Sequence, residues 1–253
     1  MGVESNFEYG SRQGFWRVLE LFRKHNMVFT CYAIGKAIEE NPTVVPAMEQ
    51  IGCEIASHAY RWIDYNLYTK DPEAEKVHVR MVVSAIRKTR ESGKPPVGWY
   101  TGRDTINTKR LVQEVFNEMN IPLLYNSDAY NDDLPYWIES PARKGGQDEG
   151  MLIVPYTGDN NDMRFDKSPG FTTPDQFFEY LKAAFDTLYQ EGLGGSPKMM
   201  SIGLHGRLIG RPGRIAGLRE FMEYIESKPA VWITTREEIA RHWRSRFPYS
   251  PGS

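Results

Sequence analysis

The chain has 253 residues and a formal net charge of -2, so it is long enough for one large domain with a sizeable core. Hydrophobic residues make up 40% of it and charged residues 25%, which is ordinary globular composition and excludes the disordered and fibrous classes. The small net charge gives no electrostatic reason to expect nucleic acid or an anionic membrane as a partner. No apolar run approaches the roughly 20 residues needed to span a bilayer.

The two cysteines, Cys31 and Cys53, provide neither a disulfide framework nor the ligand spacing of a zinc site. The opening residues, MGVESNFEYGSR, lack the apolar stretch of a secretory signal. We therefore expect a protein of a reducing compartment, located in the cytoplasm.

Hydrophobic spacing predicts helices that alternate with short strands along the whole chain. Ser11 is expected to cap the first helix, and Gly52 to stop the second. The helices are expected at residues 11–25, 43–50, 71–91, 108–119, 174–191, 213–226 and 237–247. The strands are expected at residues 27–34, 54–57, 97–100, 123–125, 151–156, 199–204 and 231–234, with a charged loop at 140–150.

This alternation predicts an α/β protein with a parallel sheet covered by helices, and the length favours a β/α barrel over an open sheet. Such a barrel normally opens on a strand, whereas this chain opens on a predicted helix. We therefore expect a single domain, residues 1–253, that forms an incomplete or distorted β/α barrel without its first strand. Strand 27–34 would then be an open edge, which chains usually cover, so self-association into a homo-oligomer is expected.

Two of the predicted strands end at a histidine, His58 in IASHAYRWIDY and His205 in MMSIGLHGRLIGRPGR. The active sites of α/β barrels lie at the carboxyl ends of the strands. Histidine also gains and loses a proton near neutral pH, which suits acid or base catalysis. The pair predicts an enzyme in which both histidines face one cavity.

Other polar and aromatic residues follow the same predicted strands. Hydrolysis of an amide-like bond needs a base for water, a group that stabilises the oxyanion and an acid for the leaving nitrogen. Arginine can hold a carbonyl or carboxylate group but cannot shuttle protons. We therefore assign catalysis to His205, His58 and Arg103. Substrate binding is assigned to Trp62, Trp99, Tyr100, Asp128, Tyr130 and Arg207.

Six segments in order, between about residues 4 and 247, resemble the polysaccharide deacetylase superfamily. They are EYGSRQGFWRVLELF, IASHAYRWIDY, GWYTGR, YNSDAYNDDLPYW, VPYTGDNNDMRF and GLHGRLIGRPGR. Within the superfamily they resemble the allantoinase branch, whose purine-degrading enzymes open a hydantoin ring.

The resemblance has consequences for metal binding. The sugar deacetylases of the superfamily bind a divalent metal through an aspartate of a first-strand motif and two histidines spaced H-x-x-x-H. His58 matches the first histidine, but the fourth residue on is Trp62, which has an N–H donor and no lone pair for a metal. The allantoinase branch resembles a metal-independent version of this site. We therefore expect no metal ligands and no cofactor.

The resemblance also implies roles for three further positions. His205 matches the histidine of the last motif, which assists protonation of the leaving group. Tyr100 stands where the deacetylases carry an arginine, and Arg103 is expected to supply that charge instead. The acidic first-strand motif has no counterpart in MGVESNFE, so we expect a chain that is truncated at its amino end relative to the family.

The resemblance implies a hydrolase of non-peptide C–N bonds that opens the ring of allantoin or a related hydantoin or imide. The expected partner is thus a small cyclic ureide or imide, with no nucleic acid and no membrane. Two alternatives stay open. One is a carbohydrate N-deacetylase acting on chitin-type or peptidoglycan-type substrates. The other is a catalytically impaired, truncated relative that acts as a binding or assembly module.

Overall fold

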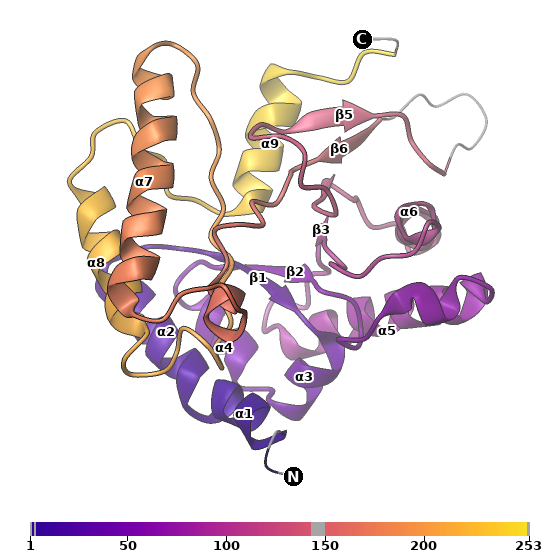
Figure 1. Cartoon of the computed structure of the whole chain (residues 1–253). Coiled ribbons are helices and arrows are strands. Elements are labelled where there is room, and N and C mark those ends of the chain that lie inside the picture. Colours follow the sequence, from indigo (N-terminus) through magenta and orange to yellow (C-terminus); the bar gives the residue numbers. More distant parts are fainter. Residues whose placement is uncertain (1, 3, 143–149, 252–253) are drawn as a thin grey trace. The chain divides into compact units, whose positions relative to one another are not determined.

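The computed structural model describes residues 2, 4–142 and 150–251. The chain forms two compact units, each built from two separate stretches of sequence. Unit 1 consists of Met1–Met27 and Tyr156–Ile233, and unit 2 of Val28–Pro155 and Thr234–Ser253 (Figure 1). No helix in the part of the chain that the structure describes is long and apolar enough to cross a membrane.

Unit 2 contains a six-stranded sheet in the order β1-β2-β3-β4-β6-β5. The first four strands and β6 pair in parallel, and β5 pairs with β6 in the antiparallel direction. In register, Ser57 of β2 lies opposite Trp99 of β3, which lies opposite Asn126 of β4. The strands are β1 (Thr30–Ala33), β2 (Glu54–Ser57), β3 (Gly98–Trp99), β4 (Tyr125–Asn126), β5 (Tyr136–Ile138) and β6 (Met151–Ile153).

The predicted α/β architecture with an incomplete or distorted barrel is confirmed, because the described sheet is mostly parallel and does not close. Its central strands are short and buried on both faces, as parallel strands covered by helices must be. Four neighbouring parallel strands, β1 to β4, therefore end at the same edge of the sheet. That edge carries most of the predicted site residues of unit 2.

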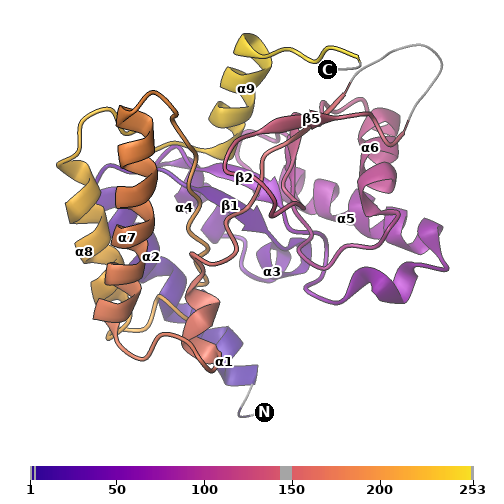
Figure 2. The same cartoon turned by 45° about the horizontal axis from the view of Figure 1, so that its top comes forward.

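Most helices of unit 2 bury apolar residues and contact β2 or a neighbouring helix. Asp71 caps α5 by accepting the backbone N–H of Ala74, and Pro72 occupies the first turn. Figure 2 shows α5 and α6 side by side. The helices are α3 (Gly35–Glu40), α4 (Val44–Glu49), η2 (Tyr65–Tyr68), α5 (Pro72–Thr89), α6 (Thr108–Glu118) and α9 (Arg236–Arg246).

Unit 1 is helical. Its first three elements form one continuous helical segment whose middle turn, η1, is a wide π turn. Helices α7 and α8 run side by side in both views (Figures 1 and 2), and Thr173 and Gln176 form a capping box at the start of α7. The elements are α1 (Glu4–Tyr9), η1 (Gly10–Gly14), α2 (Phe15–Lys24), η3 (Asp162–Asp166), α7 (Pro174–Leu193) and α8 (Ile215–Glu226).

Two predicted strands are wrong. In residues 199–204 the only pairing is a single parallel bridge between Gly203 and Asn161. In residues 231–234 there is no strand, and Trp232 is 57% exposed. Both segments are apolar, but an apolar run becomes a strand only where a neighbouring backbone pairs with it along its length.

Other elements differ in extent or were missed. Ser11 does not cap a helix: helical structure begins at Glu4, and the Ser11 hydroxyl donates to the carbonyl of Glu8 inside the helix. The short helix α3 and the edge strand β5 were not expected, because six and three residues carry too little periodicity to be read. Of the expected loop 140–150, residues 143–149 lie outside the described residues.

Candidate active site

A histidine and a buried aspartate pair within unit 1. Asp162 begins η3, where the side chain of Asn161 caps the helical turn by accepting the N–H of Met163. The Asp162 side chain is fully buried, and its Oδ1 lies 2.6 Å from Nδ1 of His205. The bridge between Asn161 and Gly203 brings the two segments together, so backbone pairing sets the position of both side chains.

The same carboxylate also holds the backbone of the turn that carries His205. Its Oδ2 accepts the N–H of His205 at 2.7 Å and that of Ile209 at 3.1 Å. The buried negative charge is thus satisfied by three hydrogen-bond donors, as a buried carboxylate requires.

This arrangement suits His205 to proton transfer. Its side chain keeps 25% of its surface exposed, while Nδ1 is engaged by the carboxylate. The other ring nitrogen, Nε2, is then the atom that can give or take a proton, with the ring orientation held by Asp162. The sequence singled out His205 but not its partner. Asp162 was one of several acidic residues in a polar loop, and nothing in their order marks the one that is buried.

Arg207 follows His205 in the same turn. Its guanidinium carbon lies 5.1 Å from the centre of the Phe7 ring, a cation–π distance. The stacking orients a planar donor group two residues from the histidine, which is compatible with the predicted role in binding an anion or a carbonyl group.

In unit 2, the carboxyl ends of the parallel strands gather an aromatic cluster around His58. The His58 ring lies 4.9 Å from that of Tyr100 and 6.4 Å from that of Tyr32. The Tyr100 hydroxyl lies 2.9 Å from the hydroxyl of Tyr130. Three of the predicted residues, His58, Tyr100 and Tyr130, are therefore brought together by strands β2, β3 and β4.

Asp128 fixes the loop that follows β3. Its carboxylate accepts the N–H of Thr101 at 2.8 Å and that of Gly102 at 2.7 Å, and Gly102 adopts a positive φ of 71°. Burial raises the pKa of Asp128 to about 6, although these two backbone donors favour its ionised form. The contacts of Asp128 are those of a group that shapes a loop.

Arg103, the next residue of this loop, stacks on Trp62. Its guanidinium carbon lies 4.4 Å from the ring centre, and its carbonyl accepts the N–H of Tyr65 at 3.1 Å. The side chain of Arg103 is exposed, so its planar donors remain accessible to a ligand.

Trp99 is a core residue. It is 1% exposed, its indole N–H donates to the Thr101 hydroxyl at 2.7 Å, and its ring packs edge-on against Phe116. Trp99 therefore packs in the core and holds Thr101 of the loop through its indole N–H, and we do not propose it as a ligand contact. A buried strand tryptophan and a pocket tryptophan have the same local sequence signature, so only burial separates them.

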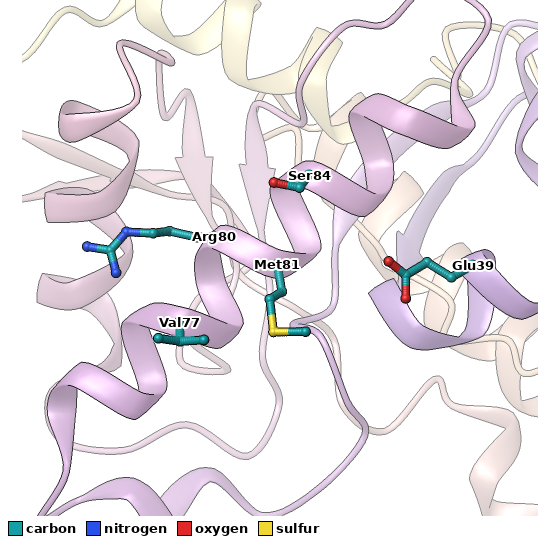
Figure 3. Close-up of a pocket in the computed structure, with 5 residues that line it drawn as sticks. All are labelled: Glu39, Val77, Arg80, Met81 and Ser84. Atoms are coloured by element: carbon teal, nitrogen blue, oxygen red, sulfur yellow. The ribbon is translucent and has the colours of Figure 1, made fainter.

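His58 belongs to unit 2 and His205 to unit 1, so the expectation that both face one cavity stays a prediction. A surface hollow of about 270 Å³ lies between α3 and α5 (Figure 3). It is lined by Glu39, Val77, Arg80, Met81 and Ser84 and contains none of the predicted site residues. We therefore assign it no part in the chemistry.

Comparison with known proteins identifies the family of the chain. Residues 2–119 match the profile of the polysaccharide deacetylase family. A Schizosaccharomyces pombe (strain 972 / ATCC 24843) protein named for polysaccharide deacetylases is 53% identical over 250 residues, which are 98% of this chain and 78% of that protein.

The chain belongs to the polysaccharide deacetylase family.

Two solved structures are similar over nearly the whole chain. One, named a probable polysaccharide deacetylase of Pseudomonas aeruginosa PAO1, has a TM-score of 0.90 at 48% identity and covers 99% of this chain and 79% of its own. The other, PuuE allantoinase, has a TM-score of 0.89 at 47% identity and covers 99% and 78%. The predicted resemblance to the family and its allantoinase branch is confirmed.

The described residues do not fit the divalent metal that the family's sugar deacetylases bind. His58 is flanked by the rings of Tyr32 and Tyr100, and Trp62 stands at the position of the second histidine. The described part of the chain contains no group of three or more His, Cys, Asp or Glu side chains that could hold a metal ion. A lone imidazole does not supply the three or four ligands of such a site, so we derive no step through a metal.

Proposed function

We propose that this protein hydrolyses a C–N bond in the ring of a cyclic ureide, as allantoinases do. The observation that carries the proposal is the 47% identity to PuuE allantoinase over 99% of the chain. Trp62 at the position where the sugar deacetylases carry a metal-binding histidine supports it, because general acid–base catalysis of ring opening needs no such ligand. If allantoin is the substrate, the protein acts in purine breakdown.

In the reaction, the oxygen of water bonds to a ring carbonyl carbon and the bond from that carbon to the ring nitrogen breaks. The carbonyl becomes a carboxylate; one proton of the water goes to the departing nitrogen and the other is released to solvent. We assign the proton transfer to Nε2 of His205. Asp162 is a positioning residue, because it holds the imidazole through Nδ1 and the turn through two backbone N–H groups.

The roles proposed for unit 2 follow from chemistry that each side chain can perform. Arg103, stacked on Trp62, can donate two parallel hydrogen bonds to a carbonyl or carboxylate group. His58 and the hydroxyl pair of Tyr100 and Tyr130 can bind the polar edge of a ureide.

A carbohydrate N-deacetylase is the second candidate. The family profile and the names of two relatives favour it, whereas Trp62 at a ligand position does not. Both candidates are hydrolases of a C–N bond, so the substrate separates them.

The test is turnover. Purified protein is incubated with allantoin, hydantoin and a cyclic imide, and the ring-opened acids are quantified. Acetate release from N-acetylglucosamine oligomers is measured in parallel with and without added divalent metal. We expect ring opening that is lost in His205→Ala and kept in His242→Ala, an exposed histidine of α9. Acetate release without ring opening would overturn the proposal in favour of the deacetylase.

Failure of both reactions would favour the third hypothesis, a catalytically impaired relative that acts as a binding module. In that case allantoin or hydantoin should still raise the melting temperature of the protein, by the mass-action effect of a ligand that binds only the folded state. Absence of turnover and of any thermal shift would reject cyclic ureides altogether.

A further inference from the structure

The turn that carries His205 is held on a second side by the amino-terminal helical segment of unit 1. A Cβ atom built on Gly14 would overlap the carbonyl oxygen of Gly206, and one built on Gly210 would overlap both Gly206 and Gly14. Three glycines thus let the backbone of the helix touch the backbone of the turn. This contact is with the residue next to His205.

The helix is widened where this contact is made. In η1 the N–H of Phe15 bonds to the carbonyl of Gly10, five residues back, so the segment forms a π turn within an otherwise α-helical stretch. π turns of this kind occur often at functional sites. A Cβ on Gly10 would lie 3.1 Å from the backbone nitrogen of Arg207, so η1 also closely approaches the turn that carries His205.

Polar contacts hold the turn to the helix. The guanidinium of Arg17 donates to the carbonyl oxygen of Gly210 and, at 2.7 Å, to the hydroxyl of Tyr9. The Arg211 guanidinium carbon lies 3.6 Å above the Tyr9 ring, and Arg211 donates to the side chain of Asn6 at 2.9 Å. A charge-assisted bond to a backbone carbonyl is stronger than a neutral one, so Arg17 restrains the far end of the turn.

We propose that the segment Glu4–Lys24 is a positioning element for His205. Gly14 sets how closely the turn can approach the helix, Arg17 donates to the carbonyl of Gly210, and Asp162 accepts the backbone N–H groups of His205 and Ile209. The imidazole is therefore oriented by contacts to both ends of its turn. The catalytic consequence of this rests on the proposed function, whereas the structural consequence does not.

The variants are chosen to move the turn without touching the reacting groups. Gly14→Ala introduces a methyl group against Gly206, and Arg17→Met removes the donors while keeping a long apolar stem. Gly213→Ala is the matched control, because it lies in the same loop with no atom within 4 Å of an added Cβ. Arg17→Lys tests rescue, since lysine restores one charged donor.

The first readout is independent of any substrate. The proton on Nδ1 of His205, bonded to Asp162, is followed by NMR and assigned by its loss in His205→Ala. We expect Gly14→Ala and Arg17→Met to shift or broaden this resonance, Gly213→Ala to leave it in place, and Arg17→Lys to restore it in part. The second readout is ring opening, where displacement of the histidine should lower kcat by about 10²-fold with a smaller change in KM.

An unchanged Nδ1 resonance in folded Gly14→Ala and Arg17→Met, with kcat within about twofold of Gly213→Ala, would overturn the inference. If Gly14→Ala does not fold, the Nδ1 resonance and kcat of Arg17→Met alone test the inference. If the wild-type protein opens no ring, the proposed function fails, and the NMR comparison alone decides whether the helix positions His205.

Discussion

Asp162 accepts hydrogen bonds from the backbone of His205, the imidazole of His205 and the backbone of Ile209, all from one turn. A carboxylate in this position does two things at once. It selects the tautomer of the imidazole, and it fixes the direction in which Nε2 points. At the scale of single residues, the predicted chemistry of His205 therefore depends on a neighbour 43 positions earlier in the chain.

Replacing Asp162 should impair catalysis without removing a reacting group. In Asp162→Asn the amide NH₂ would face an N–H donor, so at least one of the three bonds is lost. We expect kcat for ring opening to fall by about 10²-fold or more in Asp162→Asn. In His205→Ala we expect kcat to fall by about 10²–10⁴-fold. Asp159→Asn, at an exposed position of the preceding loop, is the control. Turnover of Asp162→Asn equal to that of Asp159→Asn would refute the positioning role.

The two cysteines should be chemically inert in the folded protein. Burial raises the pKa of Cys31 to about 12, with a smaller contribution from Cys53, and burial raises the pKa of Cys53 to about 11. Only the thiolate is nucleophilic, so both side chains remain in the unreactive form at pH 8. A thiol reagent should modify neither cysteine of the native protein and both after denaturation. Rapid labelling of the native protein would contradict this.

At the scale of elements, the connection from β3 to α6 is clamped at both ends by buried carboxyl groups. Asp128 accepts the N–H groups of Thr101 and Gly102 at its start. Glu75 of α5 accepts the hydroxyls of Thr105 and Thr108 at its end. Arg103 lies between the residues that Asp128 and Glu75 hold by hydrogen bonds. This explains how an exposed side chain can be held in a defined place on a loop.

The Asp128 clamp should make stability depend on pH in a defined direction. The pKa of Asp128 is raised from 3.8 to about 6, so the folded state binds its proton more tightly than the unfolded state. The stability that Asp128 contributes is fully present at a pH below its unfolded-state pKa of 3.8. It is lost as the pH rises through the folded-state pKa of about 6.

Asp128→Asn removes this titration. Each pH unit between the two pKa values changes the unfolding free energy by about 1.4 kcal/mol. The wild-type protein should therefore lose about 2 kcal/mol of stability relative to Asp128→Asn between pH 4.5 and 7.5. Denaturant titrations of both proteins across this range measure the difference. A constant difference, or one of opposite sign, would show that Asp128 is not buried as described.

At the scale of the whole molecule, the groups with candidate chemistry are divided between two compact units. Unit 1 carries His205, Asp162 and Arg207, and unit 2 carries the cluster around His58 and the loop of Arg103. Each set joins residues that are far apart in the sequence, since Asp162 and His205 are 43 positions apart and Tyr100 and Tyr130 are 30 apart. Neither set is therefore assembled until long-range contacts have formed.

Removal of divalent metal tests the molecule as a whole. The family's sugar deacetylases need a metal, whereas the residues around His58 do not form a ligand set. We therefore expect dialysis against a chelator to leave ring opening within about twofold of the untreated protein, because acid–base catalysis by His205 needs no ion. Loss of activity on chelation and its recovery with zinc, cobalt or nickel would revive the deacetylase alternative.

Much of the architecture could be predicted from local pattern. Helix and strand periodicity depends on residues within one or two turns of each other, which is why α6 and β2 were predicted within a residue of their bounds. The motifs around His58 and His205 predicted the family, since they are runs of adjacent residues. Pairing between distant segments is not contained in such patterns, and the segment at 199–204 became a single bridge for that reason.

The sequence by itself therefore determined most of the elements, the family and the identity of the candidate histidine, because each depends on residues that are neighbours in the chain. Tertiary structure alone decided that Asp162 is the buried partner of His205, that Trp99 belongs to the core and that Gly14 meets Gly206. Burial and hydrogen bonding arise from segments that are distant in the chain and adjacent in space. An aspartate can be a solvated loop carboxylate or a buried acceptor of several hydrogen bonds, and only packing separates the two.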